Sequence, residues 1–292
     1  MNIRRLIRVS RPINLILAAL TYSLGTGISH YLGHAVNPII FGLGLLAILA
    51  VQAPSTWLVE YFHLPSIPLS QGETSRDREN YRVTLLQASY AALTLFGAIV
   101  ISLLATGHLN APSGLIIFII LLFLISYSLP PMHLADLGFG ELILAVYIST
   151  LLPVLAFLLQ SDSFHRLLTF VTFPLTLLTL AYLLINDFPT YASDLRIGRH
   201  SLLTRLTWQR AIPIHHVLIL AAFLFFAAAP YFGIPWRLVW PVFAVLPFAA
   251  VQIIWLQRIS LGGRTLWNFL INLALVTFGL TAYLLAFTFW LH

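Results

Sequence analysis

Two polar segments of this 292-residue chain each begin with an acidic side chain and match one another in spacing. The matched positions, at offsets of zero, three and seven residues, are Glu60, His63 and Ile67 in the first segment and Asp187, Thr190 and Asp194 in the second. On a helix these offsets share one face. The functional interpretation is that these groups form a site at the end of the spans, because acidic residues at membrane depth are usually functional. The alternative interpretation is that the same groups lie in a headgroup region, where water and nearby arginines satisfy them.

The chain around these segments is strongly apolar. Hydrophobic residues make up 60% of it and charged residues only 8%, whereas soluble domains carry about a quarter charged residues. Nine stretches approach the roughly 20 apolar residues that a membrane span needs. They are Pro12–Tyr31, Pro38–Trp57, Val83–Thr106, Ser113–Leu129, Glu141–Gln160, Leu167–Ile185, Ala211–Tyr231, Leu238–Leu256 and Leu266–Trp290. The sequence therefore predicts an all-α polytopic membrane protein in which residues 1–292 form a single transmembrane domain.

The basic residues are all arginines, and their placement predicts an orientation. Thirteen of the 15 precede the first span or lie in the second, sixth and eighth connections, while Arg166 and Arg237 lie on the other side. By the positive-inside rule, the N-terminus is cytoplasmic and the C-terminus is outside, in an inner or plasma membrane. The net charge of +6 is thus a signal of topology and does not point to nucleic acid. Cysteine is absent, which excludes thiolate chemistry and disulfides.

The two polar connections, Glu60–Arg82 and Asn186–Arg210, are expected on the same side because four spans separate their starts. A matched spacing in both halves of the chain suggests an internal duplication around a central site. Acidic groups at membrane depth are costly and usually functional.

Four blocks of sequence carry a resemblance to a known family. They are RPINLILAALTYSLG at residues 11–25, YSLPPMHLADLGFGELILA at 127–145, LLP at 151–153 and INDFPTYASDLRIGRHSLLTRL at 185–206. Together they resemble the UbiA superfamily of intramembrane prenyltransferases over essentially the whole chain. The resemblance implies nine helices around a central chamber that opens to the cytoplasmic side.

In that family, two motifs of the form N-D-x-x-D-x-x-x-D hold Mg²⁺ ions that bind an isoprenoid diphosphate, and basic loop residues assist. Departure of the diphosphate leaves an allylic cation, which an aromatic or quinone-precursor acceptor captures. This chain departs from the pattern where the chemistry lies: Thr190 stands at the middle position of the second motif, and His63 and Ile67 stand at aspartate positions of the first. Asp136 stands where relatives supply a cation, so we expect it to repel a diphosphate.

The resemblance assigns the remaining roles residue by residue. The residual catalytic groups are Glu60, Asp187 and Asp194, and the last two are the expected ligands of one Mg²⁺. The expected substrate-binding residues are Asn186, Arg196, Arg199, Tyr127, Ser128 and His63. For Tyr127 and Ser128 the alternative is an interfacial tyrosine and a helix-packing serine. Glu141 is interpreted as structural, in the first turn of a helix.

Three functions follow from these residues. The first is a family member with a degenerate diphosphate and Mg²⁺ site, which binds an isoprenoid, quinone or pigment tail within the lipid bilayer or serves as a subunit of a larger membrane protein complex. The second is an active prenyltransferase with a reduced metal site, acting on a quinone-precursor or tetrapyrrole acceptor. The third is a terpene cyclase or hydratase.

Outside the motifs, His215 and His216 are expected to bond to neighbouring helices, with ligation of haem or a pigment as the alternative.

Overall fold

The computed structural model describes residues 3–64, 74–198 and 200–292, and these are almost entirely helical. Within them, nine helical stretches are long and apolar enough to cross a membrane, which confirms the predicted architecture. They are α2 (Pro12–Tyr31), α3 (Pro38–His63), α4 (Ser75–Ala105), α5 (Ala111–Ser128), Gly140–Leu158, Arg166–Arg196, Trp208–Phe232, Trp236–Ser260 and α14 (Trp267–Leu291). The protein is therefore an integral membrane protein.

Four of these stretches contain more than one element. The fifth combines α6 (Gly140–Val146), a π-helical turn η3 (Tyr147–Leu151) and α7 (Leu152–Leu158). The sixth combines α8 (Arg166–Asp187), the 3₁₀ turn η4 (Phe188–Thr190) and α9 (Tyr191–Ile197). The seventh combines α11 (Trp208–Ala228) and η5 (Ala229–Phe232), and the eighth combines α12 (Trp236–Val239), η6 (Trp240–Val245) and α13 (Leu246–Ser260). The short element α1 (Ile3–Val9) precedes the first span, and η2 (Leu134–Asp136) and α10 (Leu202–Leu206) lie between spans.

Polar caps explain where several spans begin. The side chain of Asn37 accepts hydrogen bonds from the backbone N–H groups of Ile39 and Ile40 at the start of α3, and Asn110 caps α5 in the same way. Thr74 and Asp77 form a capping box that starts α4 before its apolar stretch. The predicted connection of residues 60–82 is therefore shorter, because α3 and α4 continue as helices beyond the apolar residues.

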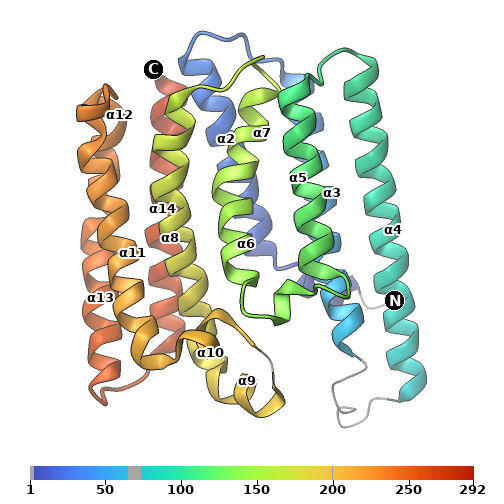
Figure 1. The fold of residues 1–292 in the computed structure, drawn as a ribbon, viewed down its shortest axis with the longest axis vertical. Helices are drawn as coiled ribbons and strands as arrows, with labels where there is room; N and C mark the ends of the chain where they lie inside the picture. The colour runs from blue at the N-terminus through green and yellow to red at the C-terminus, as the bar shows by residue number, and fades with distance from the viewer. Residues whose placement is uncertain (1–2, 65–73, 199) are drawn as a thin grey trace.

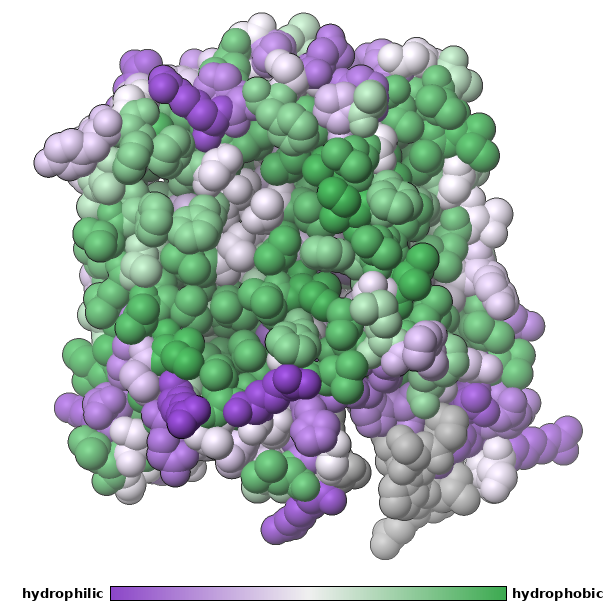
Figure 2. Space-filling view, viewed as in Figure 1, coloured by the Kyte–Doolittle hydropathy of each residue, from purple (hydrophilic) through white to green (hydrophobic). Residues whose placement is uncertain are grey.

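The helices form one bundle, with α9 and α10 at one end and the C-terminal end of α14 at the other (Figure 1). We call the end that carries α9 and α10 the site end. Along the face in Figure 2, a wide apolar band separates two more polar ends, as expected for a protein surrounded by lipid. Inside the bundle, Gly25 of α2 lies directly against the backbone of Pro153 in α7. A side chain at that position would collide with this backbone, so glycine permits the close approach of the two helices.

Candidate functional site

The second acidic segment lies where α8 ends. Pro189 follows α8 within the turn η4, so the segment is not one straight helix. Thr190 Oγ1 donates to the carbonyl of Asp187 at 3.1 Å and to Asp194 Oδ2 at 2.9 Å. The Asp194 side chain is buried, with only 4% of the residue exposed. Thr190, which replaces an aspartate of the family pattern, thus engages the neighbouring Asp194.

A cavity of about 350 Å³ opens beside this segment. Its polar lining comes from α8 and η4, from the start of α2, and from α5 and α6, and its apolar lining includes Ile13, Leu144 and Leu183. The polar residues in the wall are Arg11, Asn14, Tyr127, Glu141, Tyr182, Asn186, Asp187 and Thr190. Three residues of the second segment therefore reach this space, whereas Asp194 is not in the wall that the described residues form.

The first segment occupies the last turns of α3. Glu60 lines a second cavity of about 150 Å³, together with Thr56 and Val59. His63 is turned toward another partner, because its Nδ1 lies 3.0 Å from Oδ2 of Asp136. Ile67, the third member of the predicted set, lies outside the described residues.

Asp136 is enclosed by histidines. His133 Nδ1 lies 3.1 Å from the same carboxylate oxygen that His63 approaches. Both imidazoles therefore approach the same oxygen of this carboxylate. The repulsion of a diphosphate by Asp136 stays a prediction.

The two cavities meet at Arg11 and Tyr127, which line both of them. Arg11 separates α1 from α2 and has a left-handed backbone conformation, with φ 48°. Such a conformation is rare for a residue with a side chain and often marks a functional position. Sequence reasoning assigned Arg11 only to the topology signal, and the proline after it was the available sign of a break.

Hydrogen bonds hold this N-terminal segment against α3. The indole of Trp57 donates to Ser10 Oγ at 2.9 Å, and the amide of Gln52 donates to the carbonyl of Asn14 at 3.1 Å. Hydrogen bonds before and after Arg11 in the sequence therefore hold the connection between α1 and α2 against α3.

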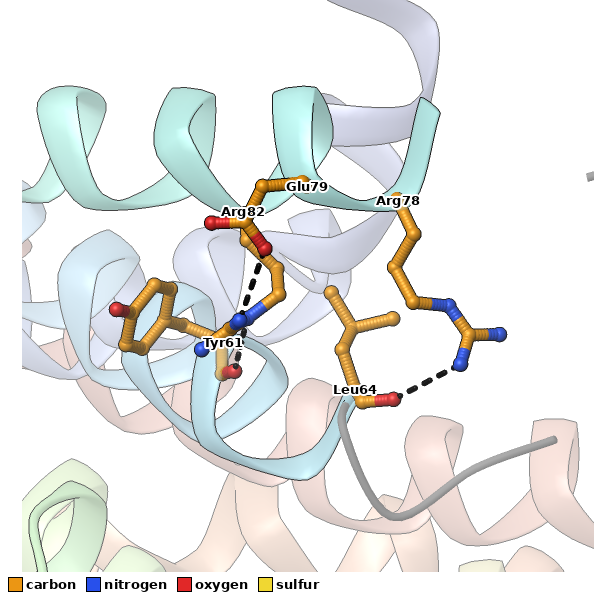
Figure 3. A network of polar contacts seen from close by, with 5 residues as sticks. All are labelled: Tyr61, Leu64, Arg78, Glu79 and Arg82. Atoms are coloured by element: carbon orange, nitrogen blue, oxygen red, sulfur yellow. Dashed lines mark hydrogen bonds and ion pairs between the residues drawn. The ribbon is translucent and has the colours of Figure 1, made fainter. Parts of the chain in front are cut away.

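The arginines predicted to bind substrate are placed differently. Arg196 is exposed on α9 and is not in the wall of either cavity among the described residues, and Arg199 lies outside those residues. In the first connection, Arg78 Nη1 donates to the carbonyl of Leu64 at 3.2 Å. Arg82 Nε donates to the carbonyl of Tyr61 at 3.4 Å (Figure 3). These two cations lie at the C-terminal end of α3, where positive charge is favourable.

Ser128 and Glu141 both link helices and loops. The hydroxyl of Ser128 is fully buried and donates to the carbonyl of Ser55 at 2.9 Å, the geometry of a helix-packing serine. Glu141 accepts a hydrogen bond from the backbone N–H of Leu202 at 3.2 Å and so connects α6 to the start of α10. Glu141 also lines the larger cavity, a position that its interpretation as structural did not anticipate.

The charges in the two cavity walls nearly cancel. The acidic residues are Glu60, Glu141 and Asp187, and the basic residues are Arg8 and Arg11. An anionic headgroup would therefore need an added cation for tight binding. Asp187 with phosphate oxygens and water is a suitable set for one Mg²⁺. Among the described residues, no group of three or more acidic, histidine or cysteine side chains could hold a metal alone.

The histidine pair of α11 lies away from these cavities. The Gln252 amide on α13 donates to His215 Nε2 at 2.7 Å, and both residues are buried. This contact confirms that His215 bonds to a neighbouring helix.

Comparisons with solved structures show the same overall fold. A UbiA homolog from Archaeoglobus fulgidus, solved bound to DMAPP and Mg²⁺, is 17% identical, with a TM-score of 0.62 over 98% of each chain. The structure of a digeranylgeranylglyceryl phosphate synthase is 15% identical, with a TM-score of 0.55 over 99% of this chain and 97% of its own. At these identities the likeness shows the fold.

The sequence itself gives the family. No curated protein matches the chain. Residues 76–273, however, match the model of the UbiA prenyltransferase family, and this range covers most of the chain and includes the second acidic segment. The chain therefore belongs to the UbiA prenyltransferase family.

Proposed function

We propose that this protein binds an isoprenoid lipid with a phosphorylated headgroup and transfers its prenyl group poorly or not at all. The observation that carries the proposal is the bond between Thr190 and Asp194. Asp194 takes part in this bond and is not in the cavity wall that the described residues form. Asp187 is therefore the carboxylate of the second motif that lines the larger cavity. A site with this donor set suits one Mg²⁺, whereas the family pattern provides ligands for two.

The surrounding residues support headgroup binding. The exposed Arg11 supplies a guanidinium in the wall that the two cavities share, and Asn14 and Asn186 add neutral polar groups to the larger cavity. A bound Mg²⁺ would neutralise phosphate charge beside Asp187. Loss of one electrostatic stabiliser typically costs an enzyme about 10²–10³ in rate. The carboxylates of the family pattern are missing at Thr190 and His63, and both losses therefore favour binding over turnover.

Ligand-dependent thermal stability tests the binding. The protein, in lipid nanodiscs, is heated with geranylgeranyl diphosphate in the presence and absence of Mg²⁺. A ligand at a hundredfold excess over its Kd stabilises the folded state by about 2.7 kcal/mol, so we expect a clear, Mg²⁺-dependent rise in Tm. Asp187→Asn should lose this rise, while Asp162→Asn, at the other end of the bundle, should keep it. An undiminished rise in Asp187→Asn would contradict the assignment.

Turnover tests the second half of the proposal. Isoprenoid diphosphates of several lengths are offered with quinone-precursor and porphyrin acceptors. We expect no significant product from the native protein and product from the double variant Ile67→Asp/Thr190→Asp. Turnover above roughly 0.1 per second that disappears in Asp187→Ala would instead establish an active prenyltransferase.

A further inference from the structure

We propose that Trp208 is a positioning residue for Asp187. Together with Trp267 it holds the ring of Phe188, and this contact fixes the direction in which the Asp187 carboxylate meets the larger cavity. The inference rests on the proposed function and names what sets the Mg²⁺ affinity of that site. We call the side chains of Phe188, Tyr191, Trp208 and Trp267 the aromatic anchor.

The turn η4 interrupts the regular helix directly after Asp187. Asp187 is the last residue of α8, and Phe188, Pro189 and Thr190 follow it as a single 3₁₀ turn. Pro189 has no backbone N–H and cannot continue the hydrogen-bond pattern of α8. Side-chain contacts therefore have a large share in setting the direction of this turn.

The residues of the turn divide between two surroundings. Asp187 and Thr190 line the larger cavity, whereas the Phe188 side chain is buried, with 2% of the residue exposed. Phe188 is not in the cavity wall that the described residues form. The turn is therefore held on the cavity side by the hydrogen bond from Thr190 to the Asp187 carbonyl, and on the other side by the packing of Phe188.

The aromatic anchor joins this turn to two other spans. The Phe188 ring lies 4.7 Å from that of Trp208, at an edge-to-face angle of 78°, and is stacked 5.9 Å from that of Trp267. The two indoles lie 5.6 Å apart, and Tyr191 lies 6.1 Å from Trp208. Aromatic rings at these separations attract one another beyond simple burial. Because Trp208 begins α11 and Trp267 begins α14, the rings tie the end of α8 to both helices.

The backbone before Trp208 is further evidence that this indole is held in place. Thr207 has φ 67° and ψ 157°, a region that is almost restricted to glycine, although threonine is β-branched. Its side chain is exposed and does not cap α11, so capping does not explain the conformation. Strain of this kind persists where the chain is fixed on both sides. On one side Leu202 of α10 donates to Glu141, and on the other Trp208 lies in the aromatic anchor.

A metal that depends on one carboxylate is sensitive to the direction of that carboxylate. Mg²⁺ requires nearly ideal octahedral geometry, with ligands at about 2.0–2.1 Å. Loss of the ring beside Phe188 frees the turn η4 to rotate, and Asp187 then meets this requirement less often. Groups that orient a metal ligand typically change metal affinity by roughly tenfold to a hundredfold.

The Mg²⁺ requirement of ligand binding tests this role. In nanodiscs with geranylgeranyl diphosphate at a fixed concentration, the rise in Tm is measured against the concentration of Mg²⁺. We expect Trp208→Leu, which keeps apolar volume but removes the ring, to need roughly tenfold to a hundredfold more Mg²⁺ for half of the rise. The full rise at saturating Mg²⁺ should be retained. Trp208→Phe restores a ring beside Phe188 and should need nearly the native concentration.

Trp236→Leu is the matched control. Trp236 also begins a helix, α12, and lies 5.2 Å from the ring of Phe243, at the opposite end of the bundle (Figure 1). Its replacement should leave the Mg²⁺ requirement unchanged. A merely structural role of Trp208 would lower the Tm of the ligand-free protein without changing the Mg²⁺ requirement, and this result would overturn the positioning role.

Fluorine NMR of the native sequence gives a second readout that needs no destabilising variant. With fluorotryptophan incorporated at the seven tryptophans, Trp208→Phe and Trp236→Phe identify two of the resonances. Addition of Mg²⁺ and ligand should shift the resonance of Trp208 but not that of Trp236. A Tm rise without a shift at Trp208 would overturn the positioning role and leave the proposed function intact. Absence of any Mg²⁺-dependent rise in the native protein would overturn the proposed function and, with it, the positioning role.

Discussion

At the scale of residues, Thr190 changes the second acidic motif through its hydroxyl. An aspartate at this position would add a second negative charge beside Asp194, and a metal would be needed to hold the two together. The threonine instead donates a hydrogen bond to Asp194. Thr190 thus brings no carboxylate to the motif and engages one oxygen of Asp194 in a hydrogen bond.

Arg11 offers a test at the same scale. Charge-assisted hydrogen bonds contribute about 1.5–3 kcal/mol. Arg11→Ala should therefore lower the affinity of the protein for an isoprenoid diphosphate by about tenfold to a hundredfold. Arg196→Ala removes an equal charge from exposed α9, where we expect less than a twofold change. Isothermal titration at two salt concentrations measures both. Equal effects of the two substitutions would show that Arg11 acts only through general charge.

Sequence reasoning named some of the residues that line the two cavities but not all of them. The spacing of Asp187 and Thr190 predicted that they share one side of the segment, and both line the larger cavity. Arg11 was missed because residue types do not reveal a left-handed backbone, and because the arginine pattern already had an explanation in topology. The pairing of His63 with Asp136 joins residues 73 positions apart, a contact that spacing cannot predict.

At the scale of elements, apolar length predicted the spans more accurately than their ends. The predicted second span stopped at Trp57, but α3 continues to His63, and α4 begins at Ser75 instead of Val83. Hydropathy marks only the part of a helix that lies in lipid. The capping box at Thr74 determines where α4 begins, and α1, which precedes the first span, was not predicted.

Alanine substitutions at two glycines in neighbouring helices are expected to change stability in opposite directions. A Cβ at Gly25 would collide with the Pro153 backbone, so Gly25→Ala should lower stability by about 1–3 kcal/mol through overpacking. At Gly42 of α3 a Cβ would meet no other atom within 4 Å. Gly42→Ala should therefore raise stability by up to about 1 kcal/mol through helix propensity. Thermal unfolding in one lipid mixture compares them, and a stabilised Gly25→Ala variant would refute the close packing of α2 on α7.

At the scale of the whole molecule, the arginine distribution predicts which end faces the cytoplasm. We propose that the site end is cytoplasmic. Because the native chain has no cysteine, single cysteines can report this without background. In sealed vesicles, Arg76→Cys and Arg196→Cys should react with an impermeant reagent from the same side, and His292→Cys from the other. Labelling of positions 76 and 196 from opposite sides would rule out the nine-span arrangement.

The fold was predictable at this scale because lipid restricts a long apolar chain to helices that satisfy their own backbone. Nine apolar stretches therefore implied nine spans, and the motifs supplied their arrangement. The shapes of the cavities were not predictable, because they depend on which side chains of distant helices leave space unfilled. Tyr127, in the wall of both site cavities, shows this dependence.

The hydrogen bond between Thr190 and Asp194 also bears on how far the folded state depends on a metal ion. Carboxylates clustered for a metal repel one another until the ion arrives, so the folded state of such a site is linked to metal concentration. Here a neutral donor stabilises Asp194 within the chain itself. We therefore expect the stability of the site end to depend less on Mg²⁺ than that of a site built from carboxylates alone.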